Sequence, residues 1–120
     1  MIVYERQQEV PDTDLVDLGD PAGLGGRVIS GNPKIAARFD FQGSNINAGI
    51  FEATTGVVEI TFPFTEHATI IEGEVTITDQ TGRSFAYKPG DSYFIRQGEV
   101  VLWEVKGKRV RKSFFHIFES

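Results

Sequence analysis

The sequence contains no cysteine, only two histidines and no long run of apolar residues. Without cysteine the chain has no disulfide framework, no thiolate site for zinc or an iron–sulfur cluster, and no cysteine nucleophile. Two histidines are too few for a three-histidine metal site within one chain, so a metal would depend on carboxylates or on a second chain. These absences restrict the possible chemistry before any motif is considered.

The sequence also lacks a membrane segment and a basic bias. No run approaches the roughly twenty apolar residues that a membrane-spanning helix needs. Residues 1–10 include Glu5, Arg6 and Glu9, and so lack the apolar centre of a secretory signal. A net charge of −5 disfavours binding to nucleic acid or to anionic membranes. We therefore expect one compact cytoplasmic domain with neither kind of partner.

One basic cluster interrupts this acidic balance. It consists of Lys106, Lys108, Arg109, Arg111 and Lys112. Because it lies beside a predicted turn at 106–108 and a predicted strand, we interpret it as the solvated end of a hairpin rather than as a phosphate-binding groove.

Glycine and proline divide most of the chain into short segments in which inward and outward residues alternate with a period of two. In residues 35–41, for example, Ile35, Ala37 and Phe39 alternate with smaller or polar residues. Such alternation predicts half-buried β-strands. Nine strands are predicted, at residues 35–41, 46–53, 57–62, 68–71, 74–78, 83–87, 92–95, 100–105 and 110–118. Turns are predicted at 54–56, 72–74, 79–82, 88–91, 96–99 and 106–108, which indicates an all-β sandwich or small barrel.

The first 33 residues differ from the rest in character. They mix aspartates with scattered apolar residues and end near a glycine cluster of Gly23, Gly25 and Gly26. That cluster lacks the preceding strand, following helix and lysine of a phosphate-binding loop. We predict that residues 1–33 form an N-terminal arm, with a short strand or turn at most, that packs on a barrel domain of residues 34–120.

Ten phenylalanines are many for this length, and most lie in predicted strands. Core packing is the simplest interpretation for the majority of them. Two other uses stay open, an aromatic pocket inside a small barrel and a contact between subunits.

Two stretches of the sequence resemble the two conserved motifs of cupins. Residues 56–75, GVVEITFPFTEHATIIEGEV, resemble the first motif, and residues 89–98, PGDSYFIRQG, resemble the second. Residues 103–105 and 110–114 extend the similarity to small single-domain cupins similar to the cupin domain of (S)-ureidoglycine aminohydrolase. The resemblance implies a double-stranded β-helix, the jelly-roll cupin barrel, with a small-molecule pocket inside.

The resemblance transfers poorly to the metal site. Metal-dependent cupins place a histidine pair and a glutamate in the first motif and a histidine in the second. Glu66 keeps the expected spacing before Gly73, but residues 59–62 replace the histidine pair and Val101 stands at the third histidine's position. Because three of the four usual ligands are missing and one carboxylate holds a transition metal poorly, we predict no metal and no cofactor at this site.

Strand alternation then suggests which residues face the pocket. If Glu66 points into the barrel, the neighbouring His67 points outward, and His116 is interpreted as packed or hydrogen-bonded rather than as a metal ligand. The predicted ligand-binding residues are Glu66, Tyr93, Val101, Trp103 and Lys112. A buried carboxylate needs a cationic or hydrogen-bonding partner or becomes protonated, and Lys112 is the suggested partner.

Three functions remain open from the sequence. The first is the binding of a small polar metabolite in the barrel without catalysis. The second is a metal-independent enzyme in which Glu66 is the catalytic acid or base, and the third is a structural dimer module with a filled barrel. Unpaired edge strands and the N-terminal arm favour a homodimer over a monomer.

Overall fold

The protein is an antiparallel jelly roll with two short 3₁₀ turns. We describe it from a computed structural model that covers every residue from Met1 to Ser120. Its elements, in chain order, are η1 (Asp12–Asp14), β1 (Val16–Gly19), η2 (Pro21–Leu24), β2 (Gly26–Gly31), β3 (Ile35–Gln42), β4 (Ile46–Thr61), β5 (Thr65–Glu72), β6 (Val75–Thr78), β7 (Ser84–Tyr87), β8 (Ser92–Ile95) and β9 (Val100–Ile117). The predicted all-β jelly-roll fold is confirmed.

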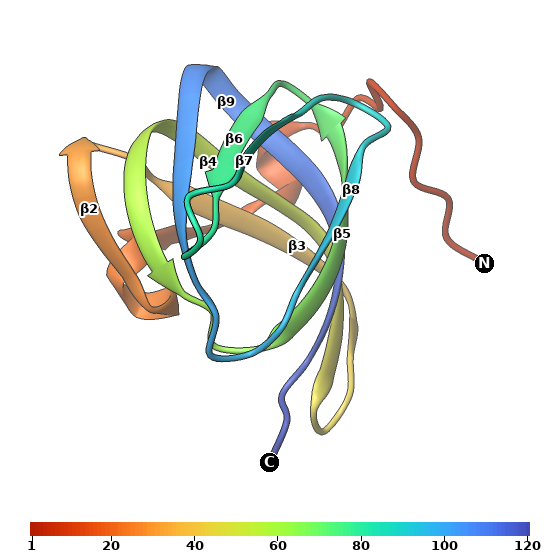
Figure 1. The fold of residues 1–120 in the computed structure, drawn as a ribbon. Coiled ribbons are helices and arrows are strands. Elements are labelled where there is room, and N and C mark those ends of the chain that lie inside the picture. The colour runs from red at the N-terminus through yellow and green to blue at the C-terminus, as the bar shows by residue number, and fades with distance from the viewer.

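Two long strands, β4 and β9, form the frame of the barrel, and both bend around it (Figure 1). Their first and last halves pair antiparallel with different neighbours. The first sheet has the order β1-β3-β4-β9-β5-β8, and the second joins β2, the second half of β4, the first half of β9, β6 and β7. The space between these two sheets is the barrel interior.

Two predicted turns are wrong. Residues 54–56 and 106–108 do not reverse the chain, and each lies within a single continuous strand. The register between β4 and β9 shifts between Thr54 and Gly56, where both strands bend together and keep their pairing on either side. Gly56 is needed at this bend because an added Cβ would lie 2.7 Å from the ring of Pro33. A turn-like composition here produces a bulge that carries both strands from one sheet into the other.

The N-terminal arm is more structured than predicted. Its strands β1 and β2 pair with β3 and β4, so the arm extends both sheets. Side chains of Tyr4, Val10 and Leu15 form a small apolar cluster with Ile50 and Ile71 on the outer face of the first sheet. The boundary between residues 33 and 34 stays a prediction. No helix in the structure is long and apolar enough to span a membrane.

The interpretation of the basic cluster as a solvated hairpin end is also wrong. Arg111 and Lys112 are both buried, Arg111 beneath the N-terminal arm and Lys112 inside the barrel. Of the five cluster residues, Lys106 and Lys108 are exposed, and Arg109 is partly buried. Successive residues of a strand point to opposite faces, and here each face is covered by a different part of the chain.

The phenylalanines do not mainly fill the core. Only Phe62, Phe64 and Phe114 are buried. The six that are exposed are Phe39, Phe41, Phe85, Phe94, Phe115 and Phe118. The main core instead consists largely of aliphatic side chains and Trp103 between the two sheets. Six of the ten phenylalanine rings therefore contribute to the protein surface rather than to the core.

Candidate functional site

A buried carboxylate–lysine–tyrosine cluster lies inside the barrel. Lys112 on β9 donates hydrogen bonds to Glu66 Oε2 at 2.8 Å and to the Tyr93 hydroxyl at 2.5 Å. The Tyr93 hydroxyl in turn donates to the same Glu66 oxygen at 2.5 Å. These residues come from β5, β8 and β9, which are neighbours in the first sheet. The partner predicted for Glu66 is therefore present, and the carboxylate is only 1% exposed.

Aromatic rings surround the lysine end of this cluster. The Lys112 Nζ atom lies 4.6 Å from the ring centroid of Phe51 and 4.8 Å from that of Trp103. It also lies 5.3 Å from the centroid of Tyr93. Cation–π contacts of this kind stabilise an ammonium group that has lost its water. The three rings therefore take the place of water around the Lys112 side-chain nitrogen.

These contacts determine the protonation of the two acidic groups. Burial alone raises the pKa of Glu66, but the charge of Lys112 and the hydrogen-bond donors around the carboxylate outweigh burial and lower the pKa to about 2. Burial and the adjacent carboxylate raise the pKa of Tyr93 well above its usual value. At neutral pH Glu66 is therefore a carboxylate and Tyr93 a neutral phenol.

His116 completes the polar end of the site, although it is not among the residues predicted to bind a ligand. Its Nε2 atom lies 3.0 Å from the side-chain amide nitrogen of Asn47, which is a donor, so Nε2 accepts and the ring proton resides on Nδ1. Nδ1 lies 3.9 Å from Glu66 Oε1, which is too far for a hydrogen bond. It is the one buried side-chain polar atom of the protein without a hydrogen-bond partner. Phe64 stacks on the ring with a centroid distance of 3.7 Å.

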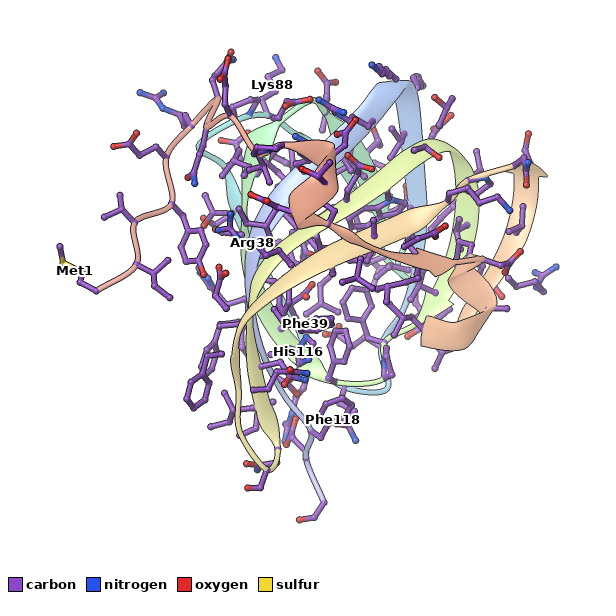
Figure 2. The ribbon with its side chains drawn as sticks, turned by 180° about the vertical axis from the view of Figure 1, so that it is seen from behind. Met1, Arg38, Phe39, Lys88, His116 and Phe118 are labelled. Carbon is purple, nitrogen blue, oxygen red and sulfur yellow. The ribbon has the colours of Figure 1, made fainter.

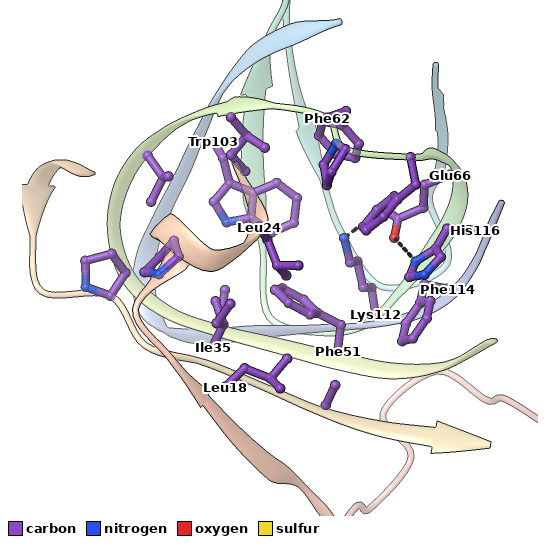
Figure 3. A pocket seen from close by; sticks show the side chains of 18 of the residues that line it. Leu18, Leu24, Ile35, Phe51, Phe62, Glu66, Trp103, Lys112, Phe114 and His116 are labelled. Carbon is purple, nitrogen blue, oxygen red and sulfur yellow. Dashed lines mark hydrogen bonds and ion pairs between the residues drawn. The ribbon is translucent and has the colours of Figure 1, made fainter. Parts of the chain in front are cut away.

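A cavity of about 90 Å³ adjoins this polar end (Figure 3). Its polar lining is confined to Glu66, Lys112 and His116. The other walls are apolar and come from both sheets and from the N-terminal arm. They are formed by Leu18, Pro21, Leu24, Pro33, Ile35, Ala37, Phe39, Phe51, Ala53, Val58, Ile60, Phe62, Pro63, Phe64, Trp103 and Phe114.

The structure brings most of the predicted site residues together. Glu66, Trp103 and Lys112 line the cavity, and Tyr93 contacts two of them from just behind the wall. Val101 is buried and faces inward with Trp103, as alternation predicts, but it packs in the core and does not line the cavity. Their role in binding stays a prediction.

Alternation along β9 contained the signal for His116. Lys112, Phe114 and His116 are separated by two residues each, and all three face the interior. Extending the face of Lys112 by four residues would have included His116. Leu18 and Leu24 of the N-terminal arm also line the cavity, but no sequence pattern predicted this. Nothing in the sequence indicates where the arm crosses the mouth of the barrel.

The site does not fit the metal that many cupins hold. Nowhere in the protein do three or more histidine, aspartate or glutamate side chains come together in a way that could hold a metal ion. At the barrel site only Glu66 and His116 are potential ligands, and one oxygen of Glu66 already accepts from Lys112 and Tyr93. A cation at Glu66 would also lie close to the ammonium group of Lys112.

The ion pair between Glu66 and Lys112 should make the free energy of unfolding decrease at acid pH. Its pKa is about 2 in the folded protein against 4.5 as the usual value, so its stabilising contribution is complete above pH 4.5 and is lost as the pH falls towards 2. At about 1.4 kcal/mol per pH unit, roughly 2 kcal/mol should be lost by pH 3. Urea unfolding at pH 5 and pH 3 would measure this loss, and Glu66→Gln should lack it. An equal pH dependence in both proteins would contradict the assignment.

Comparisons with known proteins give one matching family model and several solved structures of similar fold. The model of the EutQ-like cupin domain matches residues 42–114. The EutQ protein of Clostridium difficile is similar in structure, with a TM-score of 0.64 and 18% identity over 92% of this chain and 80% of that one. A protein of unknown function from Pseudomonas syringae pv. tomato has a TM-score of 0.73 and 24% identity over 85% of this chain and 43% of its own.

A third similar structure is an enzyme, the ectoine synthase of P. lautus. Its TM-score is 0.66, with 18% identity over 98% of this chain and 78% of that one. At these identities the three structures show the fold and nothing about the reaction. A search of curated proteins finds no match.

Proposed function

This chain belongs to the family of EutQ-like cupin domains, and we propose that it binds in its barrel a compact, mostly apolar molecule with one hydroxyl group. The observation that carries the proposal is the unpartnered Nδ1 of His116, which is buried at the polar end of an apolar cavity. Buried donors are almost always paired, so an unpaired one at a cavity wall favours a missing hydrogen-bonding group.

The spacing of the two free atoms favours a hydroxyl. Nδ1 of His116 and Oε1 of Glu66 are 3.9 Å apart. A hydroxyl oxygen placed about 2.8 Å from both would accept from the histidine and donate to the carboxylate. A carboxylate ligand could not donate to Glu66. An ammonium ligand would lack an acceptor for the histidine proton, and it would lie near Lys112.

The size and lining of the cavity restrict the rest of the molecule. A cavity volume of about 90 Å³ is several times the roughly 10–15 Å³ that one water molecule needs, so the cavity admits a small alcohol such as 1-butanol. Apolar walls favour an aliphatic chain over a second polar group. The ligand would thus be polar at one end only, and less polar overall than the metabolite expected from the sequence.

The alternatives have weaker support. A general acid at neutral pH needs a raised pKa, and the lowered pKa of Glu66 disfavours an enzyme that uses this residue as its acid. A cavity beside a buried polar cluster disfavours a barrel that serves only as a filled structural module. The closer similarity to ureidoglycine aminohydrolase and the cytoplasmic location remain predictions.

The single tryptophan provides a direct test, because Trp103 lines the cavity and no other residue contributes an indole signal. We expect 1-butanol to shift the Trp103 indole resonance in a saturable titration. His116→Phe should weaken this binding about tenfold through the lost hydrogen bond, while 1-chloropropane, which lacks the hydroxyl, should bind both proteins equally. His67→Phe is the matched control, because His67 is exposed and points away from the barrel.

Two results would contradict the proposal. One is the absence of any saturable shift with short alcohols. The other is an alcohol affinity that equals that of 1-chloropropane and is unchanged in His116→Phe.

A further inference from the structure

The polar end of the barrel cavity is shielded from solvent. Glu66 is 1% exposed, Trp103 3% and His116 6%. A molecule that is to reach the free nitrogen of His116 must therefore pass a part of the cavity wall that moves.

Most of this wall is held by strand pairing. Its sides come from β3, β4, β5 and β9, and each of these strands has a paired neighbour on both edges. The loop that joins β4 to β5 is fixed as well. The backbone N–H of Phe62 donates to the carbonyl of Glu99, and the carbonyl of Phe62 accepts from Gly98, both at 2.9 Å. Movement of any of these parts would break buried backbone hydrogen bonds.

Residues 20–24 of the N-terminal arm are the exception. They contain η2 and connect β1 to β2 across the barrel mouth, where Leu24 points into the cavity (Figure 3). Figure 2 shows the arm running from Met1 over the first sheet to η2 on the far side of the barrel. Only Pro21 and Leu24 of this segment line the cavity. Pro21 is buried and Leu24 is partly buried, whereas the residues between and before them are exposed.

The hydrogen bonds of this segment are all local. The N–H of Gly23 donates to the carbonyl of Asp20 at 3.4 Å, and that of Gly25 donates to the carbonyl of Ala22 at 3.3 Å. The N–H of Ala22 donates to the Asp20 side chain at 2.7 Å. The segment can therefore leave the barrel as a unit without losing a hydrogen bond to it.

A glycine in the left-handed region flanks the segment on each side. Gly19 has a φ of 75° and Gly25 a φ of 76°. The chain is anchored at both places, because Gly19 pairs with Ile35 on β3 and Gly26 pairs with Ile60 on β4. These two glycines are suitable hinges, since backbone rotation there leaves the adjoining strands paired.

We infer that residues 20–24 form a lid that opens to admit the ligand of the barrel and closes over it. This inference rests on the proposed function only for the identity of the ligand. In the closed state Pro21 and Leu24 complete the apolar wall, and the removal of their apolar surface from water favours closure. Opening loses only these contacts, so the lid opens far more often than the barrel unfolds.

Acrylamide quenching of the single tryptophan tests the lid without a bound ligand, because Trp103 lines the cavity. Asp20→Ala removes the acceptor that orders η2 but leaves the cavity lining intact, and it should raise the quenching constant about fivefold. Leu24→Ser weakens the apolar contact of the lid and should raise the constant about tenfold. Asp79→Ala, which removes a similar side-chain acceptor from the turn between β6 and β7, is the matched control and should not change it.

Phe39→Ser tests a competing entrance at the other end of β3. Phe39 also lines the cavity and is 37% exposed. Quenching that increases in Phe39→Ser but in neither Asp20→Ala nor Leu24→Ser would overturn the lid. The same conclusion would follow if Asp20→Ala and Leu24→Ser both had the quenching constant of the wild-type protein.

Exchange of 1-butanol separates the lid from the identity of the ligand. A looser lid destabilises the closed state of the free and the bound protein alike, so Asp20→Ala should accelerate association and dissociation about fivefold and change Kd less than about twofold. Line shapes of the Trp103 indole resonance would measure both rates. Rates equal to those of the wild-type protein would overturn the lid. Increased quenching in Asp20→Ala and Leu24→Ser without any saturable shift by 1-butanol would support the lid and contradict only the proposed ligand.

Discussion

Lys112→Met is expected to lower the free energy of unfolding by about 3–5 kcal/mol at pH 7, because it leaves Glu66 buried without its countercharge. In the wild-type protein this carboxylate is 1% exposed and depends on the ammonium group 2.8 Å away. Methionine preserves most of the volume and the contacts with Phe51 and Trp103. The loss should therefore report the charge rather than a cavity, and urea unfolding would measure it.

Acid should partly rescue this variant. Without Lys112 the remaining effect of burial raises the pKa of Glu66 in the folded state. The folded protein then binds a proton more tightly than the unfolded chain, so stability increases as the pH falls towards the usual pKa. The gap between the variant and the wild-type protein should narrow between pH 7 and pH 4.5. The double variant Glu66→Gln with Lys112→Met should be more stable at pH 7 than Lys112→Met alone.

Lys106→Met is the matched control, since Lys106 lies on the same strand but is exposed, and it should change stability by less than about 0.5 kcal/mol. A small effect of Lys112→Met that did not depend on pH would contradict the ion pair described here.

Arg111→Met should have the second largest effect, a loss of about 3 kcal/mol together with release of the N-terminal arm. The buried guanidinium donates to Glu52 at 2.8 Å, to the backbone carbonyl of Val10 at 2.7 Å and to Asp12 at 2.6 Å. Its removal leaves the partly buried Glu52 and the carbonyl of the buried Val10 without this donor. One side chain thus connects the barrel to the arm.

Two measurements separate this effect from a general loss of stability. In Arg111→Met, trypsin or thermolysin should cleave within residues 1–15 under conditions in which the barrel stays intact. Amide exchange should accelerate at Gln7, whose N–H donates to the carbonyl of Ile71. The matched control is Arg27→Met, which removes an exposed ion pair with Glu59. Such a pair contributes about 0–1 kcal/mol to the free energy of unfolding. Uniform destabilisation with an intact arm would contradict the proposed role of Arg111.

Most of the fold was predictable because its signal is local. Alternation correctly placed His67 outside when Glu66 is inside, and Trp103 on the inward face of its strand with Val101. The suggestion that Lys112 pairs with Glu66 came instead from the need of a buried carboxylate for a cationic partner, and the structure has this pair although the two residues are far apart in the chain. Period-two patterns are set by the geometry of each strand, and a barrel with one interior converts them directly into neighbours.

The errors occurred where local composition is ambiguous. Thr54–Gly56 and Lys106–Lys108 have the composition of turns, but the chain bends there without reversing because β4 and β9 remain paired with each other. Arg111 looked solvated because its cover, the arm around Val10 and Asp12, comes from the other end of the chain. Similarly, nothing local distinguishes an exposed phenylalanine from a buried one in a strand of alternating residues.

The sequence by itself determined what the protein cannot use and what its barrel must contain. It excluded cysteine chemistry, indicated a cupin barrel without the usual ligand set, and identified Glu66 as the residue that needs a partner. Only the tertiary structure decided the protonation of that residue, the position of His116 and its unpartnered nitrogen, and the exposure of six of the ten phenylalanines. Composition and alternation are properties of single strands, whereas burial, charge pairing and surface complementarity arise only when strands from distant parts of the chain pack together.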